Sequence, residues 1–227
     1  MAKDHLGHRQ RLRKKCDDLG HKALTDNELF ELILFSVLPR VDTKPIVKRC
    51  FAQFKTFTAI LNASDAQLSH IKGLGTESVR HIKSIAILLD RISFERIKFR
   101  DVMNSWDDIE FFCMQRLSYF PIETFLVIMM DHQHKVIHVE SLGEGTINQM
   151  TIYPREVLKL ALSHDAASVI FVHNHPSGDP RASKDDITMT QSLLEVLQKA
   201  NIQLYDHLIV AGDHCVSMKG EGLFHKF

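Results

Sequence analysis

The sequence predicts an α/β (α+β) protein in which an all-helical N-terminal domain precedes a domain with a mixed sheet. Three observations support this fold class. Apolar residues recur at helical spacing over the first hundred residues. Farther along, short apolar runs alternate with helical patterns. Between them, residues 96–104 form a charged connection at which the net charge changes sign. We therefore expect two domains, residues 1–100 and 101–227.

The first part shows helical spacing in three segments between residues 29 and 88. Thr25 or Asp26, and later Ser64, stand where helix N-caps are expected. These signals predict four or five short helices. A longer helix is expected from about Thr76 to Arg96.

The second part alternates between helices and strands in the order α-β-β-α-β-α-β-β. Ser105 and Ser183 are expected to cap the first and third of its helices. A loop rich in Pro, Gly and Ser precedes Ser183. Helices are predicted over 105–117, 154–163 and 184–200, and strands over 123–130, 135–141, 168–172, 203–211 and 214–218.

The composition favours a cytoplasmic, soluble protein with no membrane segment. The four cysteines lie far apart without a C-x-x-C pair, which argues against a disulfide framework and a thiolate zinc site. The N-terminus lacks an apolar signal core, and the longest apolar runs are too short to span a membrane.

The overall net charge of zero conceals two halves of opposite sign. Residues 1–100 contain 19 Lys and Arg against 11 Asp and Glu, whereas the remainder contains 9 against 17. A basic half suits contact with nucleic acid or with an acidic partner. A solvated helix face, or docking of the two halves on each other, would explain the same pattern.

The most informative motif lies between the strand ending at residue 172 and the helix beginning at residue 184. His173 and His175 are two residues apart at the end of the strand, so both imidazoles can face one ion. Asp186 lies in the first turn of the helix. Two imidazoles and one carboxylate leave the fourth position of a tetrahedral zinc ion open for water. We therefore predict one zinc ion per chain, bound by these three residues.

Other interpretations of this stretch remain open. Two histidines at this spacing also occur without a metal. Asp185 competes with Asp186 as the carboxylate ligand, and Asp179 is expected to be a turn residue. The letters His-Asn-His around Asn174 do not by themselves indicate an HNH nuclease, whose motif extends over a longer segment.

Catalysis needs a carboxylate outside the ligand set that accepts a proton and then donates it. Glu123 begins a predicted strand in an otherwise apolar context, where a buried carboxylate costs free energy unless it is paired or functional. We predict Glu123 as the general acid/base. Ser183 is predicted to donate a hydrogen bond to the oxyanion that develops on the substrate.

These residues resemble the JAMM (MPN+/JAB) metalloprotease motif. In that motif a Glu precedes His-x-His, seven residues separate the second His from a Ser, and an Asp follows three positions later. Glu123, His173, His175, Ser183 and Asp186 fit this pattern. Among JAMM proteins, the chain is similar to the bacterial RadC family over nearly its whole length, with matching segments at 7–12, 42–45, 145–148, 154–157 and 206–210.

The resemblance implies a zinc-binding, JAB/MPN-like (cytidine-deaminase-like) fold with metallopeptidase activity on a peptide or protein substrate. It also implies a connection with DNA repair. One position departs from the family pattern, because Ala182 stands where relatives usually carry Pro before the motif serine. This change loosens the loop by up to about 1 kcal/mol of chain entropy and leaves every ligand in place.

Residues 71–79 resemble a helix-hairpin-helix motif. Glycines there let backbone N–H groups approach a phosphate at the start of the next helix, and nearby cations suit sequence-independent DNA binding. The alternative is a helix–helix turn that needs glycine only for its backbone angles. The predicted DNA contacts are Lys72, Gly73, Gly75, Arg80 and Lys83.

Two hypotheses of different class follow. In the first, the chain is a zinc hydrolase whose N-terminal helices direct it to a partner. In the second, it is a DNA-associated module whose metal domain has little catalysis. The complete set of predicted site residues favours the first, and the basic half keeps the second open.

Overall fold

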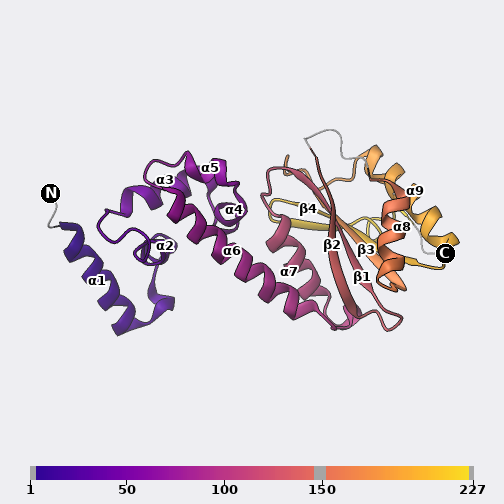
Figure 1. Ribbon diagram of the computed structural model, residues 1–227, viewed down its shortest axis with the longest axis horizontal. Coiled ribbons are helices and arrows are strands. Elements are labelled where there is room, and N and C mark those ends of the chain that lie inside the picture. The colour runs from indigo at the N-terminus through magenta and orange to yellow at the C-terminus, as the bar shows by residue number, and fades with distance from the viewer. Residues whose placement is uncertain (1–3, 146–151, 225–227) are drawn as a thin grey trace. The chain divides into compact units, whose positions relative to one another are not determined.

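The computed structural model describes residues 4–145 and 152–224 (Figure 1). The chain divides into two compact units, Met1–Ile87 and Leu88–Phe227. This division falls inside helix α6 (Thr76–Ile97), whereas the sequence placed the boundary in the charged connection after that helix. Residues 146–148, which belong to one of the segments that resemble RadC, lie outside the described residues.

The first unit is built from helices whose starts follow the predicted caps. Thr25 and Glu28 form a reciprocal capping box, and so do Ser64 and Gln67. The long helix predicted from about Thr76 is α6. The other elements are α1 (Asp4–Leu19), η1 (His21–Ala23), α2 (Asp26–Leu34), α3 (Lys44–Phe54), α4 (Phe57–Asn62) and α5 (Asp65–Ser69).

The core of this unit gathers around three phenylalanines. Phe30, Phe51 and Phe57 meet edge to face, with ring centroids 5.2–6.0 Å apart. The buried Arg9 of α1 donates to the carbonyl oxygen of Val41 at 2.6 Å. This arginine lies in segment 7–12, so part of that segment anchors α1 to the loop after α2.

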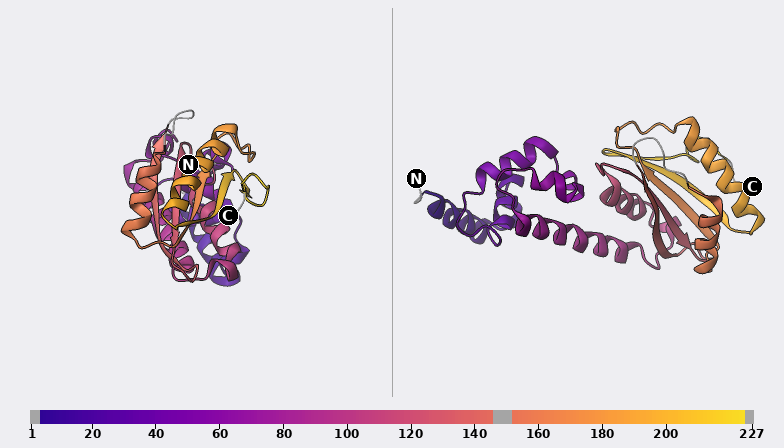
Figure 2. Two further views of the ribbon diagram at one scale, coloured as in Figure 1. Left: turned by 90° about the vertical axis from the view of Figure 1, so that its right-hand side faces the viewer. Right: turned by 45° about the horizontal axis from the view of Figure 1, so that its top comes forward.

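The second unit has a five-stranded sheet in the order β2-β1-β3-β4-β5. Figure 2 gives two further views of this sheet with its helices. Strands β3 and β4 are parallel, and the other neighbours are antiparallel, which confirms the predicted mixed sheet. The elements are η2 (Val102–Asn104), α7 (Trp106–Leu117), β1 (Glu123–Met130), β2 (Val136–Gly145), α8 (Pro154–Ser163), β3 (Ser168–Asn174), α9 (Lys184–Lys199), β4 (Gln203–Ala211) and β5 (His214–Ser217).

Helices cover both faces of this sheet, because successive side chains of a strand point to opposite faces. On one face, Leu126 and Ile170 pack with α7. On the other, Phe125 and Phe171 pack with α8 and α9. Figure 1 shows α7 on one side of the sheet and α8 and α9 on the other. Strands buried on both faces explain the continuous apolar runs in the sequence.

Two local predictions need correction. Strand β2 extends to Gly145, past the predicted end at residue 141, because it pairs with the full length of β1 up to Glu123. Ser105 precedes α7, but its side chain accepts no hydrogen bond from the helix because its backbone (φ −139°, ψ 34°) is not in the extended conformation of an N-cap; its hydroxyl donates to the carbonyl oxygen of Asp101 at 2.6 Å. Across the described ranges, none of the helices combines the length and the apolar character that crossing a membrane requires.

Candidate metal centre

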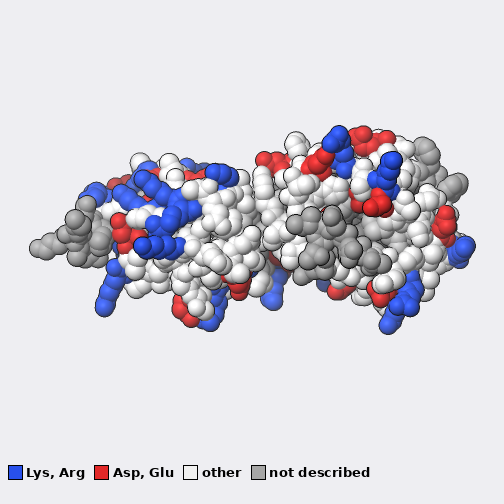
Figure 3. Space-filling model, turned by 90° about the horizontal axis from the view of Figure 1, so that it is seen from above, with Lys and Arg blue, Asp and Glu red and all other residues white. Residues whose placement is uncertain are grey.

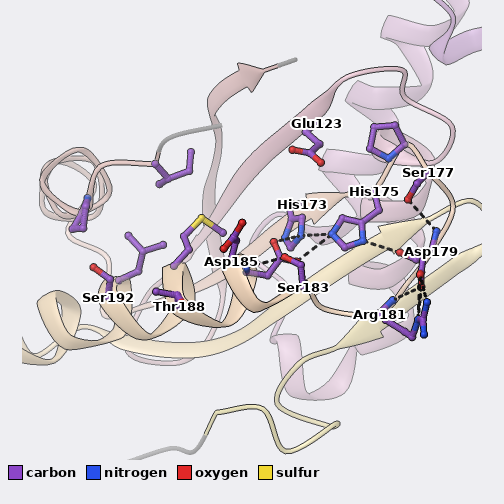
Figure 4. Close-up of a pocket in the computed structure, with 16 residues that line it drawn as sticks. Glu123, His173, His175, Ser177, Asp179, Arg181, Ser183, Asp185, Thr188 and Ser192 are labelled. Carbon is purple, nitrogen blue, oxygen red and sulfur yellow. Dashed lines mark hydrogen bonds and ion pairs between the residues drawn. The ribbon is translucent and has the colours of Figure 1, made fainter. Parts of the chain in front are cut away.

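Strand β3 delivers two histidines to one end of a pocket (Figure 4). With the period of two, His173 lies on the same sheet face as Phe171, which packs toward α9. His175 follows just after the strand ends. The two Nε2 atoms are 3.0 Å apart, and the His173 residue is only 2% exposed.

Helix α9 brings the third side chain, Asp186, which lies in the first turn after the N-cap Ser183. The Asp186 carboxylate lies 3.1 Å from His173 Nε2 through Oδ1 and 3.3 Å from His175 Nε2 through Oδ2. Burial disfavours the charged carboxylate, but hydrogen bonds from the two imidazoles in their protonated form outweigh it. The pKa of Asp186 therefore lies well below its usual range.

The candidate donor groups lie close together: 3.0 Å separates the two Nε2 atoms, 3.1 Å separates His173 Nε2 from Asp186 Oδ1, and 3.3 Å separates His175 Nε2 from Asp186 Oδ2. Bonds of about 2.0–2.2 Å to a tetrahedral ion would separate neighbouring ligand atoms by roughly 3.3–3.6 Å. The observed distances of 3.0–3.3 Å need to lengthen only slightly to reach those values. His173, His175 and Asp186 can therefore hold a metal ion, as the sequence predicted.

A buried hydrogen-bond chain sets the tautomer of His173. The Thr190 hydroxyl donates to the carbonyl oxygen of Asp186 at 2.6 Å, so it accepts from Nδ1–H of His207, also at 2.6 Å. His207 Nε2 then accepts from Nδ1–H of His173 at 2.8 Å. Burial lowers the pKa of His207 well below its usual value, which keeps this ring neutral. A neutral His173 consequently presents a lone pair at Nε2.

His175 is oriented in the same way by a main-chain acceptor. Its Nδ1 donates to the carbonyl oxygen of Asp179 at 2.7 Å, which leaves Nε2 directed at the cluster. The hydrogen bond with Asp186 is the main reason why the pKa of His175 is raised. Two lone pairs and a carboxylate at this separation need a positive charge between them, and a proton or a metal ion can supply it.

The pocket has a volume of about 980 Å³ and extends along α9 from the cluster. Glu123 lines it from the start of β1 and is half-buried (Figure 4). Its charge contributes to the raised pKa of His175, so the carboxylate lies within electrostatic reach of the ligands. The pocket continues past Thr188 to apolar residues, namely Ile152, Pro154, Met189 and Leu193.

The neighbouring residues Asp185 and Asp179 differ from Asp186 in their position relative to the two histidines. Asp185 is exposed and lines the pocket, but it does not belong to the cluster of three ligands. Asp179 forms a turn with Arg181, whose guanidinium donates to its carboxylate at 2.6 Å. Asp186 therefore has the geometry of the ligand.

The predicted DNA contacts have different surroundings in the first unit. Lys72 and Arg80 are exposed, and Arg80 pairs with Glu77. Lys83 instead donates to the carbonyl oxygens of Leu61 and Ala63, both at 3.0 Å, and burial lowers its pKa. Its ammonium group thus satisfies carbonyl oxygens at the C-terminal end of α4.

The two predicted glycines also differ from each other. Gly73 has a φ of 103°, and a Cβ placed there would lie 2.8 Å from two side-chain atoms of Ile46. Gly75 has open space around it. Gly73 therefore meets a packing requirement of the turn. Lysines and arginines gather on the face of this unit that is seen in Figure 3.

Three residues near the cluster have roles that the sequence argument did not assign. The sequence did not indicate the contact of His207 with His173, which the structure places at 2.8 Å. Nor did it indicate Thr190, whose hydroxyl accepts from His207. Asn174 contacts the start of β1 through its side-chain amide. A polar residue inside a fully buried strand, as His207 and Asn174 both are, was the available signal.

Comparison with known proteins extends this description. Residues 103–223 match the family model of the RadC-like JAB domain. A UPF0758 protein of Rhodobacter capsulatus is 37% identical over 212 residues, which cover 93% of this chain and 99% of the relative. A UPF0758 protein of Ruegeria pomeroyi is 36% identical over 215 residues, which cover 95% of this chain and 96% of the relative. The similarity thus includes the helical unit as well as the metal centre.

Proposed function

This chain belongs to the RadC-like JAB-domain family, and we propose that it is a zinc-dependent hydrolase of the metallopeptidase type. The convergence of His173, His175 and Asp186 at a pocket that Glu123 also lines is the observation behind the proposal. Two imidazole nitrogens and one carboxylate form a donor set of catalytic zinc sites, which keep one position open.

When bound, zinc would supply Lewis acidity to a water molecule and to the carbonyl group of the substrate. Glu123 accepts a proton from the water as its oxygen attacks the carbonyl carbon. The same carboxyl group then donates this proton to the leaving nitrogen as the C–N bond breaks. Glu123 therefore ends the reaction as it began, ionised.

Ser183 has two roles in this proposal. Its Oγ accepts the N–H of Asp186 at 3.1 Å, which starts α9, and its hydroxyl donates to Asp186 Oδ2 at 2.6 Å. A bound cation makes that carboxylate a weaker acceptor. The hydroxyl can then turn to the substrate oxygen, on which negative charge develops.

The first experiment measures zinc per purified chain. We expect about one zinc in the wild type and none in the double variant His173→Ala/His175→Ala. Asp186→Asn should lose the metal, whereas Asp185→Asn, the matched change at the exposed neighbour, should retain it. A wild type that takes up no zinc on reconstitution would overturn the proposal.

The second experiment tests catalysis. A library of peptides and unfolded proteins is incubated with the zinc-loaded wild type and with Glu123→Gln. We expect cleavage by the wild type that Glu123→Gln lowers by at least about 10²-fold with zinc retained, because general acid–base catalysis contributes about that much. Equal cleavage by both proteins would show that Glu123 is not the general acid/base.

A second candidate function is DNA association through the first unit, as residues 1–87 contain 15 Lys and Arg against 9 Asp and Glu. Exposed Lys72 lies beside α3, where Arg49 donates to its carbonyl oxygen at 2.5 Å. We propose that Lys72→Glu weakens binding to duplex DNA. It should also reduce the slope of log affinity against log salt concentration, by at most the contribution of about two phosphate contacts. Lys83→Met is the control, because this ammonium already binds carbonyl groups. Wild-type affinity that does not change with salt would remove this candidate.

A further inference from the structure

We propose that Asn174 is a positioning residue that fixes Glu123 relative to the metal ligands. The inference deepens the proposed function, since it rests on Glu123 as the acid/base of that site. Asn174 stands between the two histidine ligands in the sequence. Its residue is only 1% exposed, and its side chain leaves β3 toward the start of β1.

The side-chain amide of Asn174 contacts the main chain on both sides of Glu123. Its Oδ1 accepts the N–H of Thr124 at 2.8 Å, and its Nδ2 donates to the carbonyl oxygen of Ile122 at 3.0 Å. A second donated bond reaches the carbonyl oxygen of Phe120 at 3.1 Å. Both amide hydrogens and the amide oxygen are therefore used, all on the segment that leads into Glu123.

These bonds replace sheet pairing at the place where it stops. The β1–β3 ladder ends at the pair Phe125 and His173. Beyond it, the backbone of Asn174 pairs with Val210 of β4. The amide side chain therefore continues the connection between β1 and β3 for the residues that precede Phe125.

The position of Glu123 depends on its backbone, because no described residue forms a hydrogen bond with its carboxylate. On the other side of β1, among the described residues, Glu123 pairs with Gly145 at the end of edge strand β2. Asn174 thus links Glu123 rigidly to His173 and His175. This link matters because misplacing a catalytic group by about 1 Å can cost roughly 10²-fold in rate.

The test compares the zinc-loaded wild type with Asn174→Ala, Asn174→Asp and the control Gln203→Ala, which removes an amide from the far end of the same sheet. Three quantities are measured: zinc per chain, hydrogen exchange of the Thr124 amide, and the position of Glu123 in a crystal structure. We expect Asn174→Ala to retain zinc, to speed Thr124 exchange at least roughly tenfold and to displace Glu123.

Asn174→Asp keeps the acceptor for Thr124 but loses both donors, so we expect slow Thr124 exchange and a displaced carbonyl of Ile122. This variant decides the matter if Asn174→Ala does not fold. Unchanged Thr124 exchange with Glu123 in place in Asn174→Ala would overturn the proposal. So would loss of zinc with Glu123 in place, because Asn174 would then serve the ligands.

Enzyme kinetics provide an independent test. On any peptide that the wild type cleaves, Asn174→Ala should lower kcat by roughly 10²-fold with little change in KM, and add little to the loss in Glu123→Gln. A pure KM effect would contradict positioning. If the wild type cleaves nothing, the proposed function fails, while exchange and crystal positions still decide whether Asn174 holds Glu123.

Discussion

Ser183 and Asp186 hold each other at the start of α9. The main-chain N–H of Ser183 donates to Asp186 Oδ2 at 2.7 Å, and the N–H of Asp186 donates to Ser183 Oγ at 3.1 Å. One capping box therefore begins the helix and also orients the carboxylate that we propose as a metal ligand. The carboxylate has its direction before a metal ion arrives, which lowers the entropy cost of binding the ion.

Removal of this cap should affect both stability and metal binding. Ser183→Ala loses the bond that satisfies the N–H of Asp186, so we expect a loss of about 1 kcal/mol in unfolding free energy. Zinc affinity should fall by roughly 10- to 100-fold because the carboxylate loses its orientation. Urea denaturation of the metal-free protein and competition with a chelator measure the two effects. Ser192→Ala, at another exposed pocket serine of α9, should change neither, and equal behaviour of the two variants would contradict the argument.

His207 should control zinc affinity without touching the ion. In His207→Ala the Nδ1–H of His173 loses its acceptor, so the lone pair at Nε2 is no longer enforced. We expect a roughly 10- to 100-fold weaker affinity. His207→Gln, whose carbonyl oxygen can accept this hydrogen, should recover part of the loss. Nitrogen-15 NMR of the imidazoles would report the tautomer of His173 directly, and an unchanged tautomer in His207→Ala would disprove the hydrogen-bond chain.

The two glycines of the turn before α6 should respond differently to the same substitution. Gly73→Ser places a side chain at a φ of 103° and 2.8 Å from the buried Ile46. We expect it to destabilise the protein by about 1–3 kcal/mol. Gly75→Ser meets open space and should change stability by less than about 0.5 kcal/mol. Thermal unfolding of both variants tests this pair, and similar melting temperatures would show that the turn tolerates a side chain at residue 73.

Glu28 should make the stability of the first unit depend on pH. The hydrogen bonds from Lys15, at 2.7 and 2.8 Å, are the largest cause that lowers the pKa of Glu28 from 4.5 to about 2. Since the folded pKa lies below the unfolded one, the stabilisation is complete above pH 4.5. It is lost as the pH falls toward 2.

The comparison of wild type with Glu28→Gln tests this expectation by urea denaturation between pH 5 and 3. The difference in unfolding free energy should shrink as the pH falls, and it should stay below about 1 kcal/mol because the pair is partly solvated. Lys15→Met should return the pKa of Glu28 toward 4.5. A constant difference across this range would show that Glu28 keeps its ordinary pKa.

The sequence by itself determined the elements and the candidate ligands that depend on local rules. Spacing of two on a buried strand put His173 and His175 on one side, and the capping signal at Ser183 placed Asp186 in the first turn of a helix. Such rules act within a few residues, so they can be recognised in one sequence. They failed at Ser105, whose backbone is not extended as an N-cap requires and whose hydroxyl bonds to Asp101.

Only the tertiary structure decided which distant residues complete the site. The bond from Thr124 to Asn174 spans 50 positions, and the contact of His173 with His207 spans 34. These contacts exist because β3 lies between β1 and β4 in the sheet, an order that no local pattern encodes. The same holds for Lys83, whose positive charge suggested DNA contact until the fold placed its ammonium on the carbonyl end of α4. Local periodicity specifies which face a side chain occupies, whereas its partners depend on which strands and helices pack together.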